Sequence, residues 1–323
     1  MVPVYPLKRL YPMTLHTHRS LPVSTDSPSP LPDISVCIVN WNTRTLIDRC
    51  LHSLYTTHQT PSFEVIVVDN GSQDGSPLWI AENYPQTILI ENTENRGFGS
   101  ANNQALRESR GRYCLLLNSD TLVFDETLDA LIAFMDAHPD AGVATGQVFK
   151  TSDRTDRVIS YAPTAPSPGV LFFNDLISLT GLKKLFPNST LVERWAWIGR
   201  NLEKEQQVEN VTGAFMAVRR TAMEQVGLFD EAIFMYMEES DWCCRFLDAG
   251  WKIYYTPSMS IVHLCEGSSR MRSDRDRLYY RSLAYFFRKH YGWTGWLTYM
   301  LQEYLLLRWL RFFHRRWLRL RTR

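Results

Sequence analysis

The chain has 323 residues, of which 45% are hydrophobic and 21% charged, enough for a large core and one or two domains. Its six cysteines form no CxxC pair, and they are not expected to form a disulfide framework. The formal net charge of +1 is unevenly placed, because residues 308–323 hold seven arginines and no acid. The rest carries 28 basic and 34 acidic residues, and this asymmetry suggests a polyanionic partner.

The N-terminal segment 1–32 is rich in Pro, Ser and Thr, lacks the apolar run of a secretory signal, and is predicted to be disordered. Cys37 and Cys114 lie inside apolar runs that have the character of strands. Both are expected to be buried thiols in a reducing compartment, which favours a cytoplasmic location.

Residues 33–150 alternate apolar runs with segments of helical spacing. Strands are predicted at 34–39, 63–68, 87–91, 112–117 and 141–149, and helices around 46–54, 75–84, 99–109 and 127–138. Each of these strands is apolar throughout, which is typical of a parallel sheet covered on both faces. The fold class is therefore α/β, with a mostly parallel Rossmann-like sheet flanked by helices.

The second half of the chain is less regular. Residues 151–207 form a variable insert that has no assigned structure and could equally be a lid, an acceptor-recognition element or structural filler. Regular structure is predicted to return as a strand at 208–219, a helix at 221–226, a helix from 238 to 249, strands at 251–256 and 260–264, and a helix at 274–290.

Two aspartates follow predicted strands directly. Asp69 and Asp120 should point into one crevice, because the carboxyl ends of parallel strands meet at one edge of the sheet. Asp69 could accept a hydrogen bond from a base or ribose, and Asp120 could bind a hard divalent cation. Arg96 lies in a glycine-containing loop before a helix, which suits a phosphate or a base carbonyl. The alternative is that each aspartate only caps its loop.

A second acidic cluster opens the helix predicted from residue 238. Glu238, Glu239 and Asp241 place three carboxylates in four residues, and crowding with burial would raise the pKa of at least one, as a general base requires. The alternative is the ordinary preference of acids for the first turn of a helix. His263 lies at the end of a later strand, and its role depends on what surrounds it.

These segments together resemble family 2 glycosyltransferases, and in particular the rhamnosyltransferase-like branch that builds bacterial surface polysaccharides. The similarity covers about residues 33–290. The motifs, in the order seen in that family, are Ile38–Asn42, Val67–Ser72, Asn95–Phe98, Asn118–Asp120, Thr212–Met216, Arg219–Arg220, Gly227–Glu231, Met235–Trp242, and His263 with Gly267 and Ser268.

The resemblance implies a GT-A fold, with a nucleotide-sugar-binding half at 33–150 and an acceptor or catalytic half at 208–273. It implies inverting transfer from a nucleotide-diphosphate sugar, with rhamnose as the family-level donor, to a saccharide or lipid-linked saccharide. The donor would be bound by Val39, Asn40, Asp69, Asn95, Arg96, Gly97, Asn118, Ser119 and Asp120.

The resemblance also assigns the chemical roles. Asp120, joined in some relatives by the histidine matching His263, would hold Mg²⁺ or Mn²⁺. Glu239 would be the catalytic base, with Glu238 and Asp241 in reserve. Glutamate replaces the usual aspartate there, which shifts the carboxylate by one C–C bond, roughly 1.5 Å.

The C-terminal part, 274–323, is predicted to be a helical, amphipathic extension. Arg308, Arg311, Arg315 and Arg319 form one helical stripe, and Leu306, Leu310, Phe313, Trp317 and Leu320 form another. Residues 305–323 are therefore predicted to lie on an anionic membrane surface, at the inner face of the plasma membrane. The alternative is a helix packed on the body; the interleaved apolar residues argue against nucleic acid.

Two other functions were compatible with such a sheet. A nicotinamide-dependent oxidoreductase needs a glycine-rich turn after the first strand, and residues 40–44 contain no glycine. A non-catalytic sugar-binding or scaffold protein could retain the fold while its base changed, as the glutamate at position 239 allows. The sequence does not indicate an oligomeric state.

Overall fold

The computed structural model describes residues 31–57, 61–180, 202–265 and 274–302. From Leu31 onward these residues belong to one compact unit. Residues 1–30 of the predicted disordered segment 1–32, residues 181–201 of the insert 151–207, and the whole tail segment 305–323 therefore lie outside the described residues.

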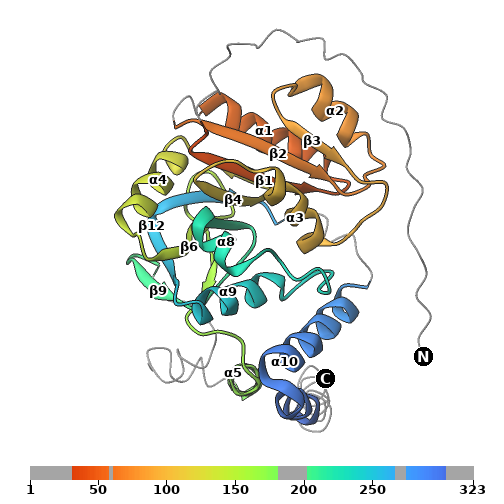
Figure 1. Ribbon diagram of the computed structural model, residues 1–323, viewed down its shortest axis with the longest axis vertical. Coiled ribbons are helices and arrows are strands. Elements are labelled where there is room, and N and C mark those ends of the chain that lie inside the picture. The colour runs from red at the N-terminus through yellow and green to blue at the C-terminus, as the bar shows by residue number, and fades with distance from the viewer. Residues whose placement is uncertain (1–30, 58–60, 181–201, 266–273, 303–323) are drawn as a thin grey trace, which may run out of the picture. The chain divides into compact units, whose positions relative to one another are not determined.

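A central mixed sheet organises the molecule (Figure 1). Its strands follow the order β3 (Ile88–Glu91), β2 (Phe63–Asp69), β1 (Ile34–Asn40), β4 (Tyr113–Asn118), β11 (Phe215–Arg219), β6 (Ala141–Phe149), β12 (Lys252–His263) and β5 (Thr121–Val123). Two short strands, β7 (Arg157–Val158) and β9 (Gln206–Val208), pair with β6 and β12, while β8 (Tyr161–Ala162) and β10 (Asn210–Val211) form a separate ribbon.

The α/β prediction is confirmed, and the parallel arrangement holds for the first half. Strands β3, β2, β1 and β4 are all parallel. The second half is mixed, because β11 runs antiparallel to both of its neighbours and β12 runs parallel to β6 but antiparallel to β5. The sheet thus departs from a mostly parallel one at the strand that follows the insert.

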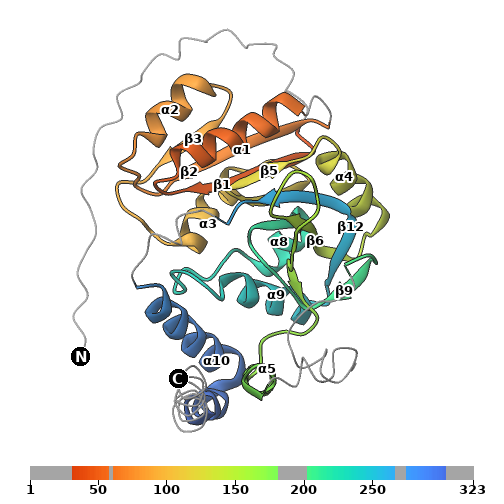
Figure 2. The same cartoon turned by 180° about the vertical axis from the view of Figure 1, so that it is seen from behind.

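Helices cover both faces of this sheet, as Figures 1 and 2 show from opposite sides. One face packs against α1 (Arg44–Thr57), α2 (Ser76–Asn83) and α4 (Thr127–Ala137), and the other against α3 (Phe98–Glu108), α8 (Arg220–Val226) and α9 (Glu238–Asp248). Strand β1 explains the pattern: Val36 and Ile38 pack on the first face and Cys37 on the second, all fully buried. A strand buried on both sides needs no polar alternation.

Two long predicted strands are interrupted. The predicted strand 208–219 splits because the amide of Gly213 bonds to a side chain, Glu239, and the amide of Thr212 bonds to Ser160, so neither joins the ladder. The two strands predicted at 251–264 are one strand, β12, whose register shifts between Tyr255 and Ser260. Pro257 lies in that shift, where a missing N–H is tolerated.

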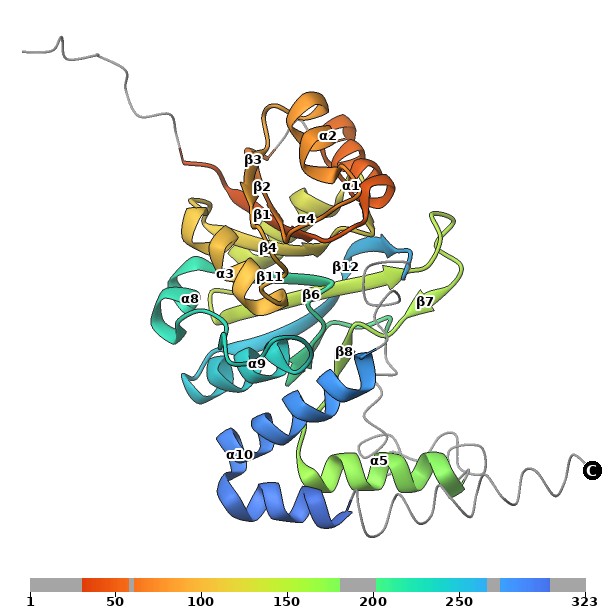
Figure 3. The same cartoon turned by 90° about the vertical axis from the view of Figure 1, so that its right-hand side faces the viewer.

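Two helices lie below α9 in Figure 3. The first, α5 (Pro168–Thr180), falls within the predicted irregular insert. The second, α10 (Arg275–Leu301), continues past the predicted end at 290 and kinks at Gly292, whose φ is 65°. Within the described ranges, no helix combines the length and apolarity needed to cross a membrane.

Candidate active site

A cavity of about 440 Å³ lies where the carboxyl ends of β1 and β4 meet the start of α9 and the end of β12. Such an edge is where open α/β sheets bind ligands. Its lining comprises Val39, Trp41, Asn70, Asn95, Phe98, Asn118, Ser119, Asp120, Met235, Tyr236, Glu238, Glu239, His263, Cys265 and Arg275.

Asp120 and His263, 143 positions apart in sequence, meet in this cavity. Strand β12 pairs with β5 so that His263 lies opposite Thr121, and the amide of Leu264 donates to the carbonyl of Asp120. The imidazole Nε2 therefore lies 3.1 Å from Oδ1 of Asp120, and 3.4 Å from the side-chain nitrogen Nδ2 of Asn118. The convergence predicted for these two residues is what the fold produces.

This pair provides one carboxylate and one imidazole as potential metal ligands. Within the described residues, no group of three or more His, Cys, Asp or Glu side chains could hold a metal by itself. Two protein ligands nevertheless suit a divalent cation whose other positions are taken by water and phosphate oxygens. The donor set fits a metal held jointly by protein and substrate.

The two glutamates at the start of α9 face the same cavity. Glu239 Oε1 accepts a hydrogen bond from the amide of Gly213 at 3.1 Å, and burial raises the pKa of its carboxyl. Glu238 is 2% exposed, and its Oε2 has no hydrogen-bond partner among the described residues. Burial and the neighbouring charge of Glu239 raise the pKa of Glu238 well above its usual value. A carboxylate whose pKa is raised toward neutral pH is a stronger base than one with the usual pKa, and it can accept a proton near neutral pH.

An unusual backbone aims these glutamates. Tyr236 and Met237, directly before them, have φ values of 67° and 72°, in the left-handed region that favours glycine. Non-glycine residues held there cost about 1–3 kcal/mol each and cluster at functional sites. The turn they form brings the first residues of α9 against the cavity.

Several predicted donor-binding residues lie beside the cavity instead of in its lining. Asp69 accepts from the side chain of Asn40 at 2.7 Å and from the amide of Ser72 at 2.8 Å, so it holds the loops together. Arg96 is exposed, with its backbone amide donating to Asn70, and Gly97 (φ 90°) shapes the same loop. These contacts give both residues a part in shaping the loops beside the cavity, while Val39, Asn95, Asn118 and Ser119 line it.

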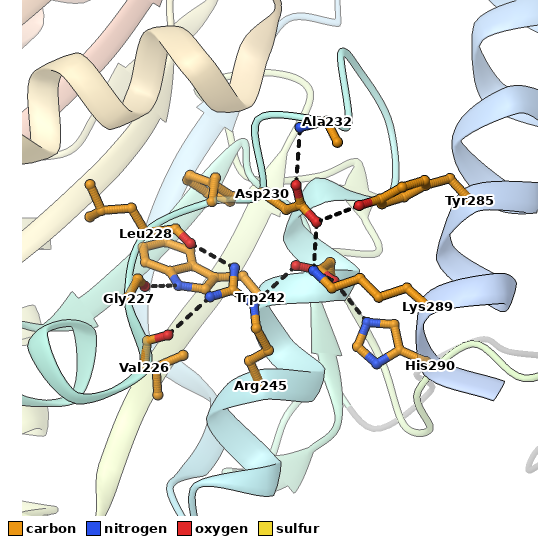
Figure 4. Close-up of polar contacts among 12 residues, drawn as sticks. Val226, Gly227, Leu228, Asp230, Ala232, Trp242, Arg245, Tyr285, Lys289 and His290 are labelled. Carbon is orange, nitrogen blue, oxygen red and sulfur yellow. Dashed lines mark hydrogen bonds and ion pairs between the residues drawn. The ribbon is translucent and has the colours of Figure 1, made fainter. Parts of the chain in front are cut away.

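Asp241, a predicted reserve base, points elsewhere. Its side chain is fully buried and bonded to Arg245, Lys289 and His290, the three partners labelled in Figure 4. These cationic and hydrogen-bonding partners hold the pKa of Asp241 at about 2, despite its burial. It does not line the cavity, so the structure corrects its assignment as a reserve base.

Other lining residues were not predicted. Trp41 and Asn70 adjoin predicted residues within the same loops, so the strand-end argument could have included them. Arg275 is different, because it stands at the start of α10, a helix with no motif of its own. No sequence signal placed its guanidinium at this cavity.

An acid-lined cavity at the carboxyl ends of the strands of an α/β sheet is a site suited to binding a substrate and a metal ion together. The chain belongs to glycosyl transferase family 2, because residues 35–227 match the family model of that name. The residues beyond 227, including α9 and α10, lie outside this match.

Relatives and a solved structure agree with this assignment. The chain is 30% identical over 242 residues to the N-acetylglucosaminyl-diphospho-decaprenol L-rhamnosyltransferase of Mycobacterium tuberculosis, covering 71% of this chain and 75% of that protein. It is 36% identical over 93 residues to the putative glycosyltransferase EpsH of Bacillus subtilis, covering 28% of this chain and 26% of that one. The mannosyltransferase PcManGT of Pyrobaculum calidifontis, solved with GDP-Man and Mn²⁺, has a TM-score of 0.55 at 20% identity, over 88% of this chain and 73% of that chain.

The fold prediction is thus confirmed as GT-A, and the predicted family is confirmed as well. The nicotinamide-dependent oxidoreductase is not supported, since the family match spans the strand-end loops in question.

Proposed function

We propose that this chain transfers a sugar, with inversion, from a nucleotide-diphosphate donor to a saccharide or lipid-linked saccharide during cell-surface polysaccharide synthesis. One observation supports this most: Asp120, His263 and Glu239, from separate parts of the chain, line one cavity. The similarity to a rhamnosyltransferase acting on a diphospho-decaprenol acceptor suggests rhamnose and a polyprenyl-diphosphate-linked sugar as the first substrates to test.

Glu239 is the base in this proposal. Its Oε1 is fixed by the Gly213 amide, which leaves Oε2 to take a proton from the acceptor hydroxyl. The freed oxygen then attacks the anomeric carbon from the face opposite the nucleotide, and the configuration inverts. Glu238 lies beside it, and burial together with the charge of Glu239 raises the pKa of Glu238, which disfavours a second negative charge at the point of attack.

Asp120 and His263 are proposed to hold the divalent cation, Mg²⁺ or Mn²⁺. When bound, that ion stabilises negative charge on the diphosphate leaving group. Among the described residues that line the cavity, Arg275 is the one arginine or lysine. It takes the phosphate-binding role that the sequence had suggested for Arg96, because a guanidinium binds phosphate oxygens in a bidentate manner.

The test compares Glu239→Gln with the wild type across a panel of UDP-, dTDP- and GDP-sugars with Mn²⁺. We expect turnover to fall by about 10²-fold or more while donor-induced thermal stabilisation is retained. Glu224→Gln, an exposed glutamate on α8, is the matched control and should leave turnover unchanged. Near-normal turnover in Glu239→Gln would exclude it as the base.

We further propose a peripheral position on an anionic membrane, at the cytoplasmic face, where a lipid-linked acceptor would be found. The arginine-rich segment 305–323 lies outside the described residues, but the helix that precedes it supports the idea. After Gly292, α10 exposes Trp293 (63%), Leu297 (52%) and Leu301 (49%), which recur every four residues on one face. An exposed apolar stripe that continues into seven arginines suits an interface of acyl chains and acidic headgroups.

Vesicle flotation tests this second proposal. The full chain should bind vesicles containing acidic phospholipid, and both removal of 305–323 and the pair Trp293→Ser with Leu297→Ser should weaken binding. Leu78→Ser, which changes an exposed leucine on α2, is the control. Binding that both variants leave unchanged would defeat the proposal.

A further inference from the structure

Helix α10 contacts the segment that carries the proposed base at three separate places. Ser282 Oγ donates to the carbonyl of Met235 at 2.7 Å. Met237, which is 5% exposed, packs in a cluster with Leu283, Phe286 and Phe287. The third contact, one turn further along α10, joins Lys289 and His290 to Asp241. The first contact lies just before the left-handed turn of Tyr236 and Met237, the second is made by Met237 itself, and the third lies just beyond the glutamates.

The third contact is a buried ionic cluster, drawn in Figure 4. Oδ1 of Asp241 lies 2.6 Å from Lys289 Nζ and 2.8 Å from His290 Nε2, and its Oδ2 accepts from Arg245 Nε at 3.0 Å. The Asp241 side chain is fully buried, while that of Lys289 is 30% exposed. Buried charges are costly unless paired, so α10 supplies partners that this carboxylate requires.

The same lysine, Lys289, also binds the turn after α8, which contains Asp230. Lys289 Nζ lies 2.7 Å from Oδ2 of Asp230, which also accepts from Tyr285 at 3.0 Å. From the other side, Arg245 donates to the carbonyls of Val226 and Leu228 at 3.1 and 2.7 Å. One network thus connects α10, the turn after α8 and the first turns of α9, as Figure 4 shows.

The geometry of α9 connects this network with the cavity. Glu239 and Asp241 are two residues apart, which is about 200° around a helix, so they project from nearly opposite sides. Asp241 faces α10 and Glu239 faces Gly213 and the cavity. A rotation or shift of this first turn that moved Asp241 would therefore move Glu239 as well.

We propose that Lys289 and His290 are positioning residues for the transfer reaction, holding the first turn of α9 so that Glu239 stays against the acceptor side of the cavity. This rests on the proposed function, in which Glu239 is the base. It extends the catalytic unit beyond residue 227, where the family match ends, into a helix that the sequence assigned to the tail.

The test uses Lys289→Met and His290→Gln, with Lys289→Arg as the conservative variant and Arg288→Met as the matched control. Arg288 is the adjacent cation on α10, but its guanidinium stacks on Trp293, 4.3 Å from the ring centroid. Each protein is assayed for kcat and donor KM well below its melting temperature. Amide hydrogen exchange is followed over residues 236–242.

We expect Lys289→Met to lower kcat by about 10-fold or more, because a misplacement of about 1 Å can cost about 10²-fold. Donor KM should change less than about twofold, since the metal-binding and phosphate-binding residues are elsewhere. His290→Gln should act in the same direction, Lys289→Arg should recover most of the lost kcat, and exchange over 236–242 should accelerate only in the first two variants.

A purely stabilising cluster gives a different result. Lys289→Met and His290→Gln would then lower the melting temperature yet match Arg288→Met in kcat, and that outcome overturns the proposal. The exchange measurement does not depend on the substrate. If the wild type transfers no sugar, the proposed function fails. Faster exchange in the variants would still support the proposal that Lys289 and His290 hold the first turn of α9, and unchanged exchange would reject it.

Discussion

Gly213 gives the sharpest test of where the proposed base must lie. A Cβ built on this glycine would stand 2.8 Å from Oε1 of Glu239, 3.0 Å from its Cγ and 3.1 Å from Cε1 of Phe98. Gly213 does not have a positive φ, so alanine adopts its backbone without strain. Gly213→Ala therefore acts mainly by displacing the Glu239 carboxylate and weakening its bond to the Gly213 amide, which is 3.1 Å long.

The size of the effect follows from these contacts. Non-bonded heavy atoms are comfortable at about 3.5 Å, so the carboxylate must retreat by roughly half an ångström or more. Since about 1 Å can cost about 10²-fold in rate, kcat should fall by about 10-fold. Stability should change little, because a weakened hydrogen bond costs about 1 kcal/mol and the loss of unfolded-chain freedom on replacing glycine returns about 0.4–1 kcal/mol.

The assay is a double-mutant cycle in kcat at saturating donor, with melting temperatures measured alongside. Gly213→Ala should lower kcat in the wild type but have little further effect in a Glu239→Gln background, because both changes remove the same function. An equal effect in both backgrounds, or a fully active Gly213→Ala enzyme, would refute the placement of Glu239 as the base.

Three further outcomes are expected. Asp120→Asn should raise the Mn²⁺ concentration needed for half-maximal activity, by at least the roughly 10- to 100-fold typical of outer-sphere partners; an unchanged metal titration would contradict its assignment. Glu238→Gln should melt higher than the wild type at pH 8 but not at pH 4.5. The raised pKa of Glu238 means that the folded state holds a proton which the unfolded state releases, so its penalty grows as pH rises above the unfolded value; parallel melting curves would contradict this. Asp241→Asn should show the opposite pH dependence, because the pKa of Asp241 falls from 3.8 to about 2 on folding. The stability that the ionised Asp241 adds, on the order of 2 kcal/mol, is nearly complete above about pH 4 and is lost toward pH 2. Acid unfolding should therefore show the wild type more stable than the variant above about pH 4, with the difference disappearing toward pH 2; a difference that does not change with pH would contradict this.

The parallel half of the fold was predictable because its strands are buried on both faces. Val36, Cys37 and Ile38 are all fully buried, so the apolar run itself identifies the strand. The antiparallel position of β11 was not predictable, since nothing local distinguishes a strand that inserts between β4 and β6 from one that joins the edge. Strand β5 has only three residues, Thr121–Val123, and gains its place by pairing with β12.

The sequence predicted those site residues whose position follows from the backbone topology. It did not predict those whose position depends on the direction of a side chain. Asp120 and His263 meet because strand ends converge; the sequence placed each of them after or at the end of a strand, and the family resemblance paired them. Glu239 and Asp241 look equivalent in the sequence, but the partners on α10 turn one of them away from the cavity. The glycine-containing loop pointed to Arg96, whereas only the fold places the start of α10, and with it Arg275, at the cavity.

The left-handed turn before α9 explains why α10 belongs with the catalytic part of the chain. Holding Tyr236 and Met237 at positive φ costs about 1–3 kcal/mol each. Burying the Met237 side chain against α10 stabilises by about 1.5–3 kcal/mol, and the Ser282 hydroxyl on the Met235 carbonyl adds about 1 kcal/mol. The backbone cost of the turn is offset to within a few kcal/mol by these two contacts, and both contacts are made by α10. The backbone that presents Glu239 therefore depends on residues 282–290, and a boundary drawn at residue 274 would separate the base from its support.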